Sequence, residues 1–141
     1  MSLRIGMLGA SRIAEQAIVG PARDLGHRLV VVAARDPQRA KHFADTYGVE
    51  RVAGGYADVI EDAQVDVVYN PLANALHAPW NIAAIRAGKP VLTEKPFARN
   101  HTEARAVADA AASAGVSVLE GFHYLFHPVT RAGRWIWPAG H

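Results

Sequence analysis

The segment at residues 4–14 reads RIGMLGASRIA, and it decides how the rest of the chain is interpreted. A short apolar run at residues 3–8 stops at Gly9, and a pattern with helical spacing begins within three residues. This order predicts a strand, a tight turn and the start of a helix. The free N–H groups and the positive dipole end of that helix would point into the turn, which is an arrangement that binds phosphate.

Length and composition indicate one globular domain. The chain has 141 residues, of which 50% are hydrophobic and 20% are charged, with a net charge of +2. A domain of this length buries enough surface to hold a core without staples. The basic residues are scattered through the predicted helices, so no nucleic-acid partner is expected. No apolar run approaches the ~20 residues of a membrane span, so no membrane partner is expected either.

The absence of cysteine narrows the chemistry further. With no cysteine in the chain, disulfides, thiolate metal ligands and cysteine nucleophiles are excluded. His123 and His127 have no acidic partners at ligand spacing, and no metal site is predicted. The sequence enters its first strand at once without a signal-peptide pattern, so we expect a cytoplasmic location.

Apolar runs and helical patterns alternate along the remaining chain. Further strands are expected at residues 28–34, 49–53, 65–69, 90–93 and 116–119. Helices are expected at residues 11–25, 37–48, 58–63, 74–87 and, from either Asn100 or Thr102, up to 114. This alternation predicts an α/β fold, a doubly wound parallel sheet of the Rossmann type with helices on both faces. Ligands of such sheets bind beyond the carboxyl ends of the strands, here near the switch point between the first and fourth.

Single residues are expected to set the helix ends. Asp36 and Pro37 suit the N-cap and the first position of the second helix. Pro21 lies inside the window of the first helix, which predicts a kink or an end there. Asn74 is predicted to cap the helix at residues 74–87.

The turn from Gly9 to Ala14 fits the dinucleotide fingerprint G-x-G-x-x-G/A with Ser11 at the second glycine. Serine is small, and its hydroxyl can donate to a phosphate. The motif alone is weak, and a strand-to-helix turn with an incidental glycine is the alternative. The strand before it and the βα units after it favour a dinucleotide site.

The end of the second strand indicates which dinucleotide is bound. Its tip is Ala33-Ala34-Arg35-Asp36. An acidic residue there would bind the ribose 2′-hydroxyl of NAD, whereas an arginine suits the 2′-phosphate of NADP. Because Asp36 is expected to cap a helix, Arg35 favours NADP, with NAD as the alternative. Arg35 could otherwise be an ordinary solvated charge.

Two residues are candidates for the reacting end of the site. Lys95 follows a buried strand, where it could exchange a proton with a substrate beside an oxidised nicotinamide. The alternative is a salt bridge to Glu94 that closes the loop. His77 lies one turn into the helix that starts near Asn74. It either faces the nicotinamide ribose or the substrate, or it packs against its neighbours, and both interpretations stay open.

Five segments together resemble the Gfo/Idh/MocA oxidoreductase family. They are residues 5–14, 34–37, 70–77, 87–96 and 120–124. The string Gly-Lys-x-Val-Leu-x-Glu-Lys-Pro at residues 88–96 is the most specific of them. The resemblance covers residues 4–128 and is strongest to members that act on sugars or on dihydrodiols.

The resemblance implies roles for individual residues. Residues implied to hold the pyrophosphate are Gly9, Ala10, Ser11, Arg12 and Ile13. Arg35 is similar to its counterpart in members that use NADP, and Leu72, Asn74 and His77 are implied to line the nicotinamide side. Glu94, Lys95 and Pro96 complete the implied cofactor-binding set. Lys95 is the implied catalytic residue, and Pro96 often follows a cis bond in such proteins.

The implied activity is hydride transfer between a nicotinamide cofactor and a secondary alcohol of a sugar-like or diol substrate. A non-catalytic NADP-binding module, or a truncated remnant that associates with a partner, is the alternative. Residues 1–128 are expected to form the NAD(P)-binding Rossmann domain and 129–141 an atypical tail, with the family's C-terminal substrate domain absent. The surface which that domain would cover is expected to be exposed or used for self-association, which would give a homo-oligomer.

Overall fold

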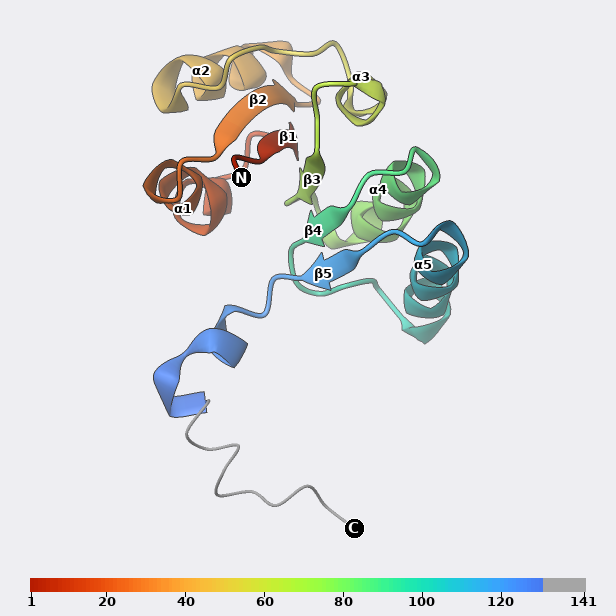
Figure 1. The fold of residues 1–141 in the computed structure, drawn as a ribbon. Coiled ribbons are helices and arrows are strands. Elements are labelled where there is room, and N and C mark those ends of the chain that lie inside the picture. Colours follow the sequence, from red (N-terminus) through yellow and green to blue (C-terminus); the bar gives the residue numbers. More distant parts are fainter. Residues whose placement is uncertain (131–141) are drawn as a thin grey trace.

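The fold is a five-stranded parallel sheet with helices around it, seen in a computed structural model that describes residues 1–130. Its strands are β1 (Arg4–Leu8), β2 (Arg28–Ala33), β3 (Val67–Asn70), β4 (Val91–Thr93) and β5 (Val118–Glu120). The spatial order is β2-β1-β3-β4-β5, so the chain winds outward in both directions from β1 (Figure 1). The predicted doubly wound fold is confirmed, and β1 pairs with β3 at the predicted switch point.

Helical segments connect the strands. They are η1 (Glu15–Val19), α1 (Gly20–Asp24), α2 (Pro37–Tyr47), α3 (Tyr56–Glu61), α4 (Asn74–Arg86), α5 (His101–Ala114) and η2 (His123–Phe126). Pro21 does not end the first helix, because the chain takes a wider π-helical turn just before it. There the Gly20 N–H donates to the Glu15 carbonyl, five residues back. None of the helices within residues 1–130 is long and apolar enough to cross a bilayer.

The strand predicted at residues 49–53 is wrong. Only Val52 forms an isolated parallel bridge, to Val32 at the outer edge of β2. The two residues before it carry charges that reach outward, where Glu50 pairs with Arg28 and Arg51 pairs with Asp62. A short run with two solvated charges and two glycines after it supplies too few apolar side chains for a full strand.

Helix caps agree with the sequence except at α4. Asp36 accepts a hydrogen bond from the Gln38 N–H, so its predicted cap is confirmed. Asn100, not Thr102, caps α5, because its Oδ1 accepts from the Glu103 N–H. The predicted cap at Asn74 is wrong: Ala73 holds the N-cap position in extended backbone, without a side-chain hydrogen bond, and Asn74 is the first helical residue.

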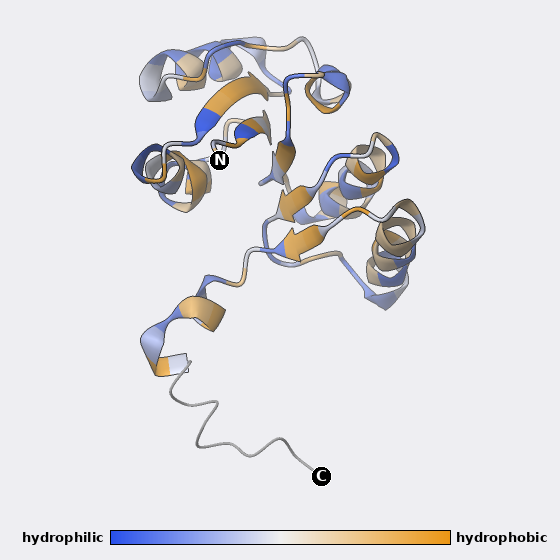
Figure 2. Cartoon of the chain, viewed as in Figure 1, coloured by the Kyte–Doolittle hydropathy of each residue, from blue (hydrophilic) through white to orange (hydrophobic). Residues whose placement is uncertain are grey.

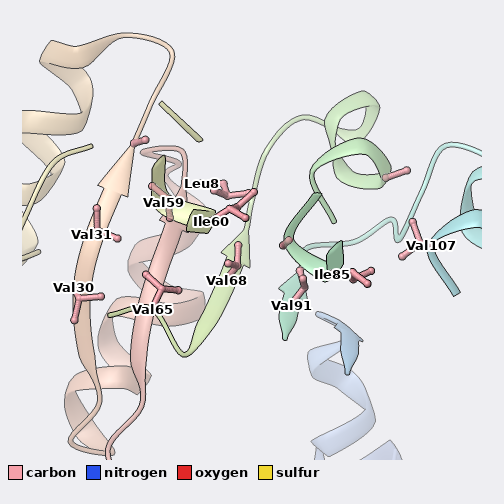
Figure 3. Close-up of a cluster of buried hydrophobic side chains, with 13 residues drawn as sticks. Leu8, Val30, Val31, Val59, Ile60, Val65, Val68, Ile85, Val91 and Val107 are labelled. Atoms are coloured by element: carbon pink, nitrogen blue, oxygen red, sulfur yellow. The ribbon is translucent and has the colours of Figure 1, made fainter. Parts of the chain in front are cut away.

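Two clusters of buried apolar side chains pack on the faces of the sheet around β1. Figure 2 shows that most of the strand residues are hydrophobic. On one face Val68 and Val91 of the strands pack with Ile85 of α4 and Val107 of α5, as Figure 3 shows. The second cluster includes Met7, Val32 and Tyr69 together with Val19 and Phe43. Because both faces of the sheet are covered here, the strand sequences are nearly continuous apolar runs.

Beyond β4 the second face is open. A cavity of about 530 Å³ lies there, lined by Leu92, Leu119, Phe122 and Phe126 among others. Leu119 is 67% exposed and Phe126 is 79% exposed. Nearly all of the atypical tail predicted at residues 129–141 lies outside the described residues, so that prediction stays untested.

Candidate functional site

A groove of about 560 Å³ lies at the carboxyl ends of β1, β2 and β3. Three segments form most of its wall: the turn after β1, the tip of β2 and the loop between β3 and α4. The lining residues from these segments are Gly9, Ala10, Ser11, Ala34, Arg35, Asp36, Pro71, Leu72 and Ala73. The groove therefore stands at the switch point, where ligands of such sheets bind.

The turn after β1 has a geometry that only glycine adopts readily. Gly9 has a φ of 101°, and its N–H donates to the Ala33 carbonyl at 2.6 Å. A Cβ on Gly9 would meet Leu72 Cδ2 at 3.0 Å. A side chain here would be strained and would push into the opposite wall of the groove, so glycine keeps the groove open.

Ser11 supplies the clearest sign of a missing partner. Its Oγ is buried, and within residues 1–130 it makes no hydrogen bond. Buried hydroxyls normally have a partner, because an unsatisfied one costs about 1–3 kcal/mol. Ser11 lines the groove just before the first helical residues. Its hydroxyl and the N–H groups of that helix end are thus available to a bound phosphate.

Arg12 and Ile13 lie outside the groove. Arg12 lines a neighbouring cavity of about 430 Å³ between the turn and α2. Ile13 is 44% exposed and begins the helical stretch. Their implied contact with the pyrophosphate stays a prediction.

Two arginines border the groove at the tip of β2. Arg35 is exposed and lines the groove, while the neighbouring Asp36 carboxylate is used as the α2 cap. Arg39, which the sequence analysis missed, also lines the groove, and its Nη2 donates to the Ala10 carbonyl at 3.0 Å. The signal was its position in the first turn of α2, directly after the strand tip that carries Arg35. Together they form a cationic edge that suits a phosphate.

His77 is placed between two loops rather than on the groove surface. It is 1% exposed, its Nε2 lies 2.7 Å from the Leu72 carbonyl and its Nδ1 lies 2.7 Å from the Pro96 carbonyl. Leu72 lines the groove, and Pro96 belongs to the loop after β4. His77 therefore connects the groove to the loop that carries Lys95. Asn74 is exposed and does not line the groove, so its role stays a prediction.

The loop after β4 holds two residues with opposite environments. Lys95 is exposed, and no hydrogen bond or ion pair from within residues 1–130 holds its ammonium. The Lys95–Pro96 bond is cis, as the resemblance implied. Glu94 is 6% exposed and accepts a hydrogen bond from the Tyr69 hydroxyl at 2.9 Å. The alternative salt bridge between Lys95 and Glu94 is therefore not formed in the described structure.

The Glu94 carboxylate faces the open cavity beside β4 and not the groove. Burial of Tyr69, with the nearby Glu94 charge, raises the pKa of the Tyr69 hydroxyl, which stays a neutral donor to that carboxylate. His123 Nε2 lies 4.0 Å from Glu94 Oε1 at the same cavity. No group of three or more potential ligand side chains that could hold a metal occurs within residues 1–130.

Known proteins with similar sequences are dehydrogenases and reductases. D-xylose 1-dehydrogenase (NADP(+)) 2 of Haloferax volcanii is 38% identical over 128 residues, which is 91% of this chain and 39% of the relative. Trans-1,2-dihydrobenzene-1,2-diol dehydrogenase of Mus musculus is 34% identical, over 95% of this chain and 41% of the relative. The resemblance to members that act on sugars and dihydrodiols is thus confirmed.

Solved structures give the same assignment. A 3-ketoreductase from Actinomadura kijaniata, in complex with NADP and TDP-benzene, superimposes with a TM-score of 0.86 at 34% identity. The match covers 96% of this chain and 42% of that one. The chain therefore spans about two fifths of the length of the relatives it matches.

The family model for the Gfo/Idh/MocA group, described as an oxidoreductase family with an NAD-binding Rossmann fold, matches residues 3–122. This stretch holds the glycine turn, the tip of β2 and the loop with Lys95. The chain belongs to the Gfo/Idh/MocA oxidoreductase family, of which it contains the N-terminal nucleotide-binding domain.

Proposed function

We propose that the groove binds NADP and that the chain acts as the cofactor-binding half of a dehydrogenase for a sugar-like or diol secondary alcohol. The observation that carries the proposal is the buried, unpartnered Ser11 hydroxyl in a turn opened by Gly9. The chemistry of this donor set fits a dinucleotide, since hydroxyl, backbone N–H and guanidinium groups all donate to phosphate oxygens.

Each end of the groove has a separate task in this proposal. Ser11 and the amides after Gly9 hold the pyrophosphate, while Arg35 and Arg39 hold the 2′-phosphate. Asp36 Oδ1 accepts the Gln38 N–H, so this carboxylate is oriented as the cap of α2. The relatives named for NADP, or solved with it, support this choice over NAD.

Lys95 is the proposed catalytic residue. When bound, the nicotinamide supplies the hydride acceptor in alcohol oxidation. The Lys95 side chain is exposed at the carboxyl edge of the sheet. As the neutral amine it would accept the proton of the substrate hydroxyl in oxidation, and as the ammonium it would return that proton in the reverse reaction. We propose that Glu94 and His77 fix the position of this loop, because both side chains are buried and hydrogen-bonded to neighbouring segments.

NADPH and NADH titrations of the 141-residue chain test the cofactor proposal. The wild-type chain is expected to prefer NADPH. Arg35→Ala should weaken NADPH binding about tenfold, equivalent to ~1.4 kcal/mol, and leave NADH nearly unchanged. The matched control is Arg86→Ala, an exposed arginine in the last turn of α4. Equal losses for the two cofactors would contradict the assignment of Arg35 to the 2′-phosphate.

An assay on polyols separates the enzyme from a non-catalytic NADP-binding module. The module is a second candidate because the chain spans only about two fifths of its relatives. Turnover that Lys95→Ala removes, with NADPH affinity kept within a few fold, supports the enzyme. Binding of NADPH without turnover of any polyol supports the module.

We also propose that the open face beside β5 mediates self-association into a homo-oligomer. The support is the exposure of Leu119, Leu125 and Phe126 around one cavity. Apolar patches on that scale commonly mark interaction surfaces. Sedimentation of the wild-type chain over a range of concentrations tests this, and a monomer throughout would contradict it.

A further inference from the structure

The two hydrogen-bond contacts of the His77 ring can both form in only one of its protonation states. Both ring nitrogens lie 2.7 Å from backbone carbonyl oxygens, those of Leu72 and Pro96. Carbonyl oxygens only accept, so each contact needs an N–H on the imidazole side. A neutral imidazole carries one N–H, whereas the imidazolium carries two. Only the imidazolium donates to both loops at once.

The two loops are separate parts of the site. Leu72 lines the groove and faces the Gly9 turn, where its Cδ2 lies 3.0 Å from the place of a Gly9 Cβ. Pro96 directly follows Lys95 in the loop after β4. His77 thus spans from the wall of the groove to the residue next to the proposed catalytic lysine.

The groove side of this connection is held in place by buried amides. Asn70 Oδ1 accepts the Leu72 N–H at 3.2 Å, and Asn70 Nδ2 donates to Asn81 Oδ1 at 2.7 Å. Asn70 and Asn81 are both fully buried. Since Leu72 is fixed through Asn70, the variable contact is the one between His77 and the Pro96 carbonyl.

The charged groups on the surrounding elements are already engaged or face solvent. Glu94 is bonded to Tyr69, and Glu120 accepts the Phe97 N–H at 2.6 Å. Lys95 is exposed. The carbonyls of Leu72 and Pro96 are therefore the groups that stabilise an added proton on the buried ring.

We propose that His77 is a positioning residue that, as an imidazolium, fixes the Lys95 loop to the wall of the dinucleotide groove. Loss of one ring proton frees one of the two loops. The nicotinamide end of the groove then loses its fixed geometry, while the Gly9 turn and Arg35 keep theirs. The identity of the ligand in this proposal rests on the proposed NADP function, whereas the protonation state of the His77 ring does not depend on it.

The protonation state of the His77 ring can be measured directly in the wild-type chain. ¹⁵N NMR of the imidazole, assigned with His77→Gln, is expected to show both ring nitrogens of His77 carrying hydrogen at neutral pH. A bare ring nitrogen at neutral pH would overturn the proposal. This measurement needs no ligand, so it stands even where NADPH fails to bind.

Two ligands then separate the ends of the groove. His77→Phe should weaken NADPH at least tenfold and change the affinity for 2′,5′-ADP, which lacks the nicotinamide half, by less than twofold. His77→Gln keeps two N–H donors and should recover most of the NADPH affinity. His101→Gln, an exposed histidine at the start of α5, is the matched control. Equal losses for both ligands in His77→Phe, or none, would overturn the proposal.

A pH series covers the case in which His77→Phe does not fold. In the wild type, the ratio of NADPH to 2′,5′-ADP affinity should fall as pH rises through the NMR titration of His77. Taking the ratio removes the titration of the 2′-phosphate, which the two ligands share, but not that of the 5′-phosphate monoester, which only 2′,5′-ADP carries. His77→Gln gives the contribution of that 5′-phosphate alone, so the wild-type ratio should fall more steeply with pH than the His77→Gln ratio. Equal slopes in the two proteins would contradict the proposal. If the wild type binds neither ligand, the NADP function fails and the NMR result alone decides the role of His77.

Discussion

The two halves of the sheet are packed to different extents. Around β1 and β2, side chains on both faces are buried, and residues 30–33 of β2 are at most 1% exposed. Around β4 and β5, one face packs on α4 and α5, while Leu119 on the other is 67% exposed. The Gly9 turn, which we propose binds phosphate, belongs to the fully packed half, and Lys95 lies at the border. We therefore expect the adenine end of the cofactor to bind independently of whatever covers the second half.

The largest expected effect is in the packed half, at Gly6 of β1. A Cβ there would lie 2.8 Å from side-chain atoms of both Val59 and Val65. Gly6→Val should lower the free energy of unfolding by about 3 kcal/mol, because overpacking a close-packed core costs roughly 1–3 kcal/mol and this site meets two valines at once. Urea denaturation measures it.

Gly55→Ala is the control for Gly6→Val, since a Cβ there meets only Asp58 Oδ2, at 4.0 Å, and the backbone is extended. It should change the free energy of unfolding by less than about 0.5 kcal/mol. A Gly6→Val variant as stable as the wild type would mean that the packed half is looser than described.

Tyr69→Phe is the next largest expected effect and tests the border between the halves. It leaves the buried Glu94 carboxylate without its donor, which should cost about 1–3 kcal/mol of unfolding free energy. The wild type should also lose stability above pH ~10, because Tyr69 ionises at about 10 when unfolded, whereas its raised pKa keeps it protonated when folded.

Urea denaturation of Tyr69→Phe at pH 7 and pH 11 checks both parts. The matched control is Tyr56→Phe, whose ring packs edge-on against Trp80. The same loss in both variants would show that the Glu94 hydrogen bond contributes nothing specific.

The sequence predicted the strands of the sheet in both halves, and the one strand that failed, at residues 49–53, lies at the outer edge of the packed half. Continuous apolar runs such as Leu-Val-Val-Val at residues 29–32 have one stable environment, a sheet buried on both faces. Residues 49–53 failed because two charges point outward, which leaves a single bridge at Val52. Gly9 and Ser11 were singled out because a strand precedes their turn and βα units follow it, and both residues line the groove.

Contacts between segments that are distant in the chain could not be predicted from the sequence. The choice for His77 between facing the ligand and packing stayed open because its partner, Pro96, is 19 residues away. The Glu94 carboxylate was paired with its neighbour Lys95 in one interpretation, yet its donor is Tyr69, 25 residues away. Arg39 could have been found from its place in the first turn of the helix that follows Arg35, and that signal was present but unused.

A smaller effect is expected at the opposite end of the strands from the groove. The Arg4 guanidinium and backbone N–H bond to the Asp66 carboxylate, which lowers the pKa of Asp66 to about 2. This carboxylate stabilises the fold above its unfolded pKa of about 4, and the contribution is lost as pH falls from 4 toward 2. Asp66→Asn should lower Tm by roughly 2–5 °C at pH 7.

The gap in Tm between the wild type and Asp66→Asn should close as pH approaches 2, because the wild-type carboxyl is then protonated. Calorimetry at pH 7, 4 and 2 measures this. Asp45→Asn, in an exposed pair with Lys41, is the control and should shift Tm little at any pH. A gap that stays constant with pH would show that the Arg4–Asp66 pair is not the cause.

The smallest effect on stability, and the sharpest test of the open face, is expected at Leu119. Because this side chain is 67% exposed, Leu119→Asp should change the unfolding free energy by less than about 0.5 kcal/mol. If the open face joins two copies, the same change places a carboxylate in an apolar interface and should shift the sedimentation equilibrium toward monomer. Leu25→Asp, at a residue 71% exposed near the end of α1, should leave the mass unchanged. If both variants associate equally, the exposed apolar side chain on β5 has no part in assembly, and the open face does not join two copies.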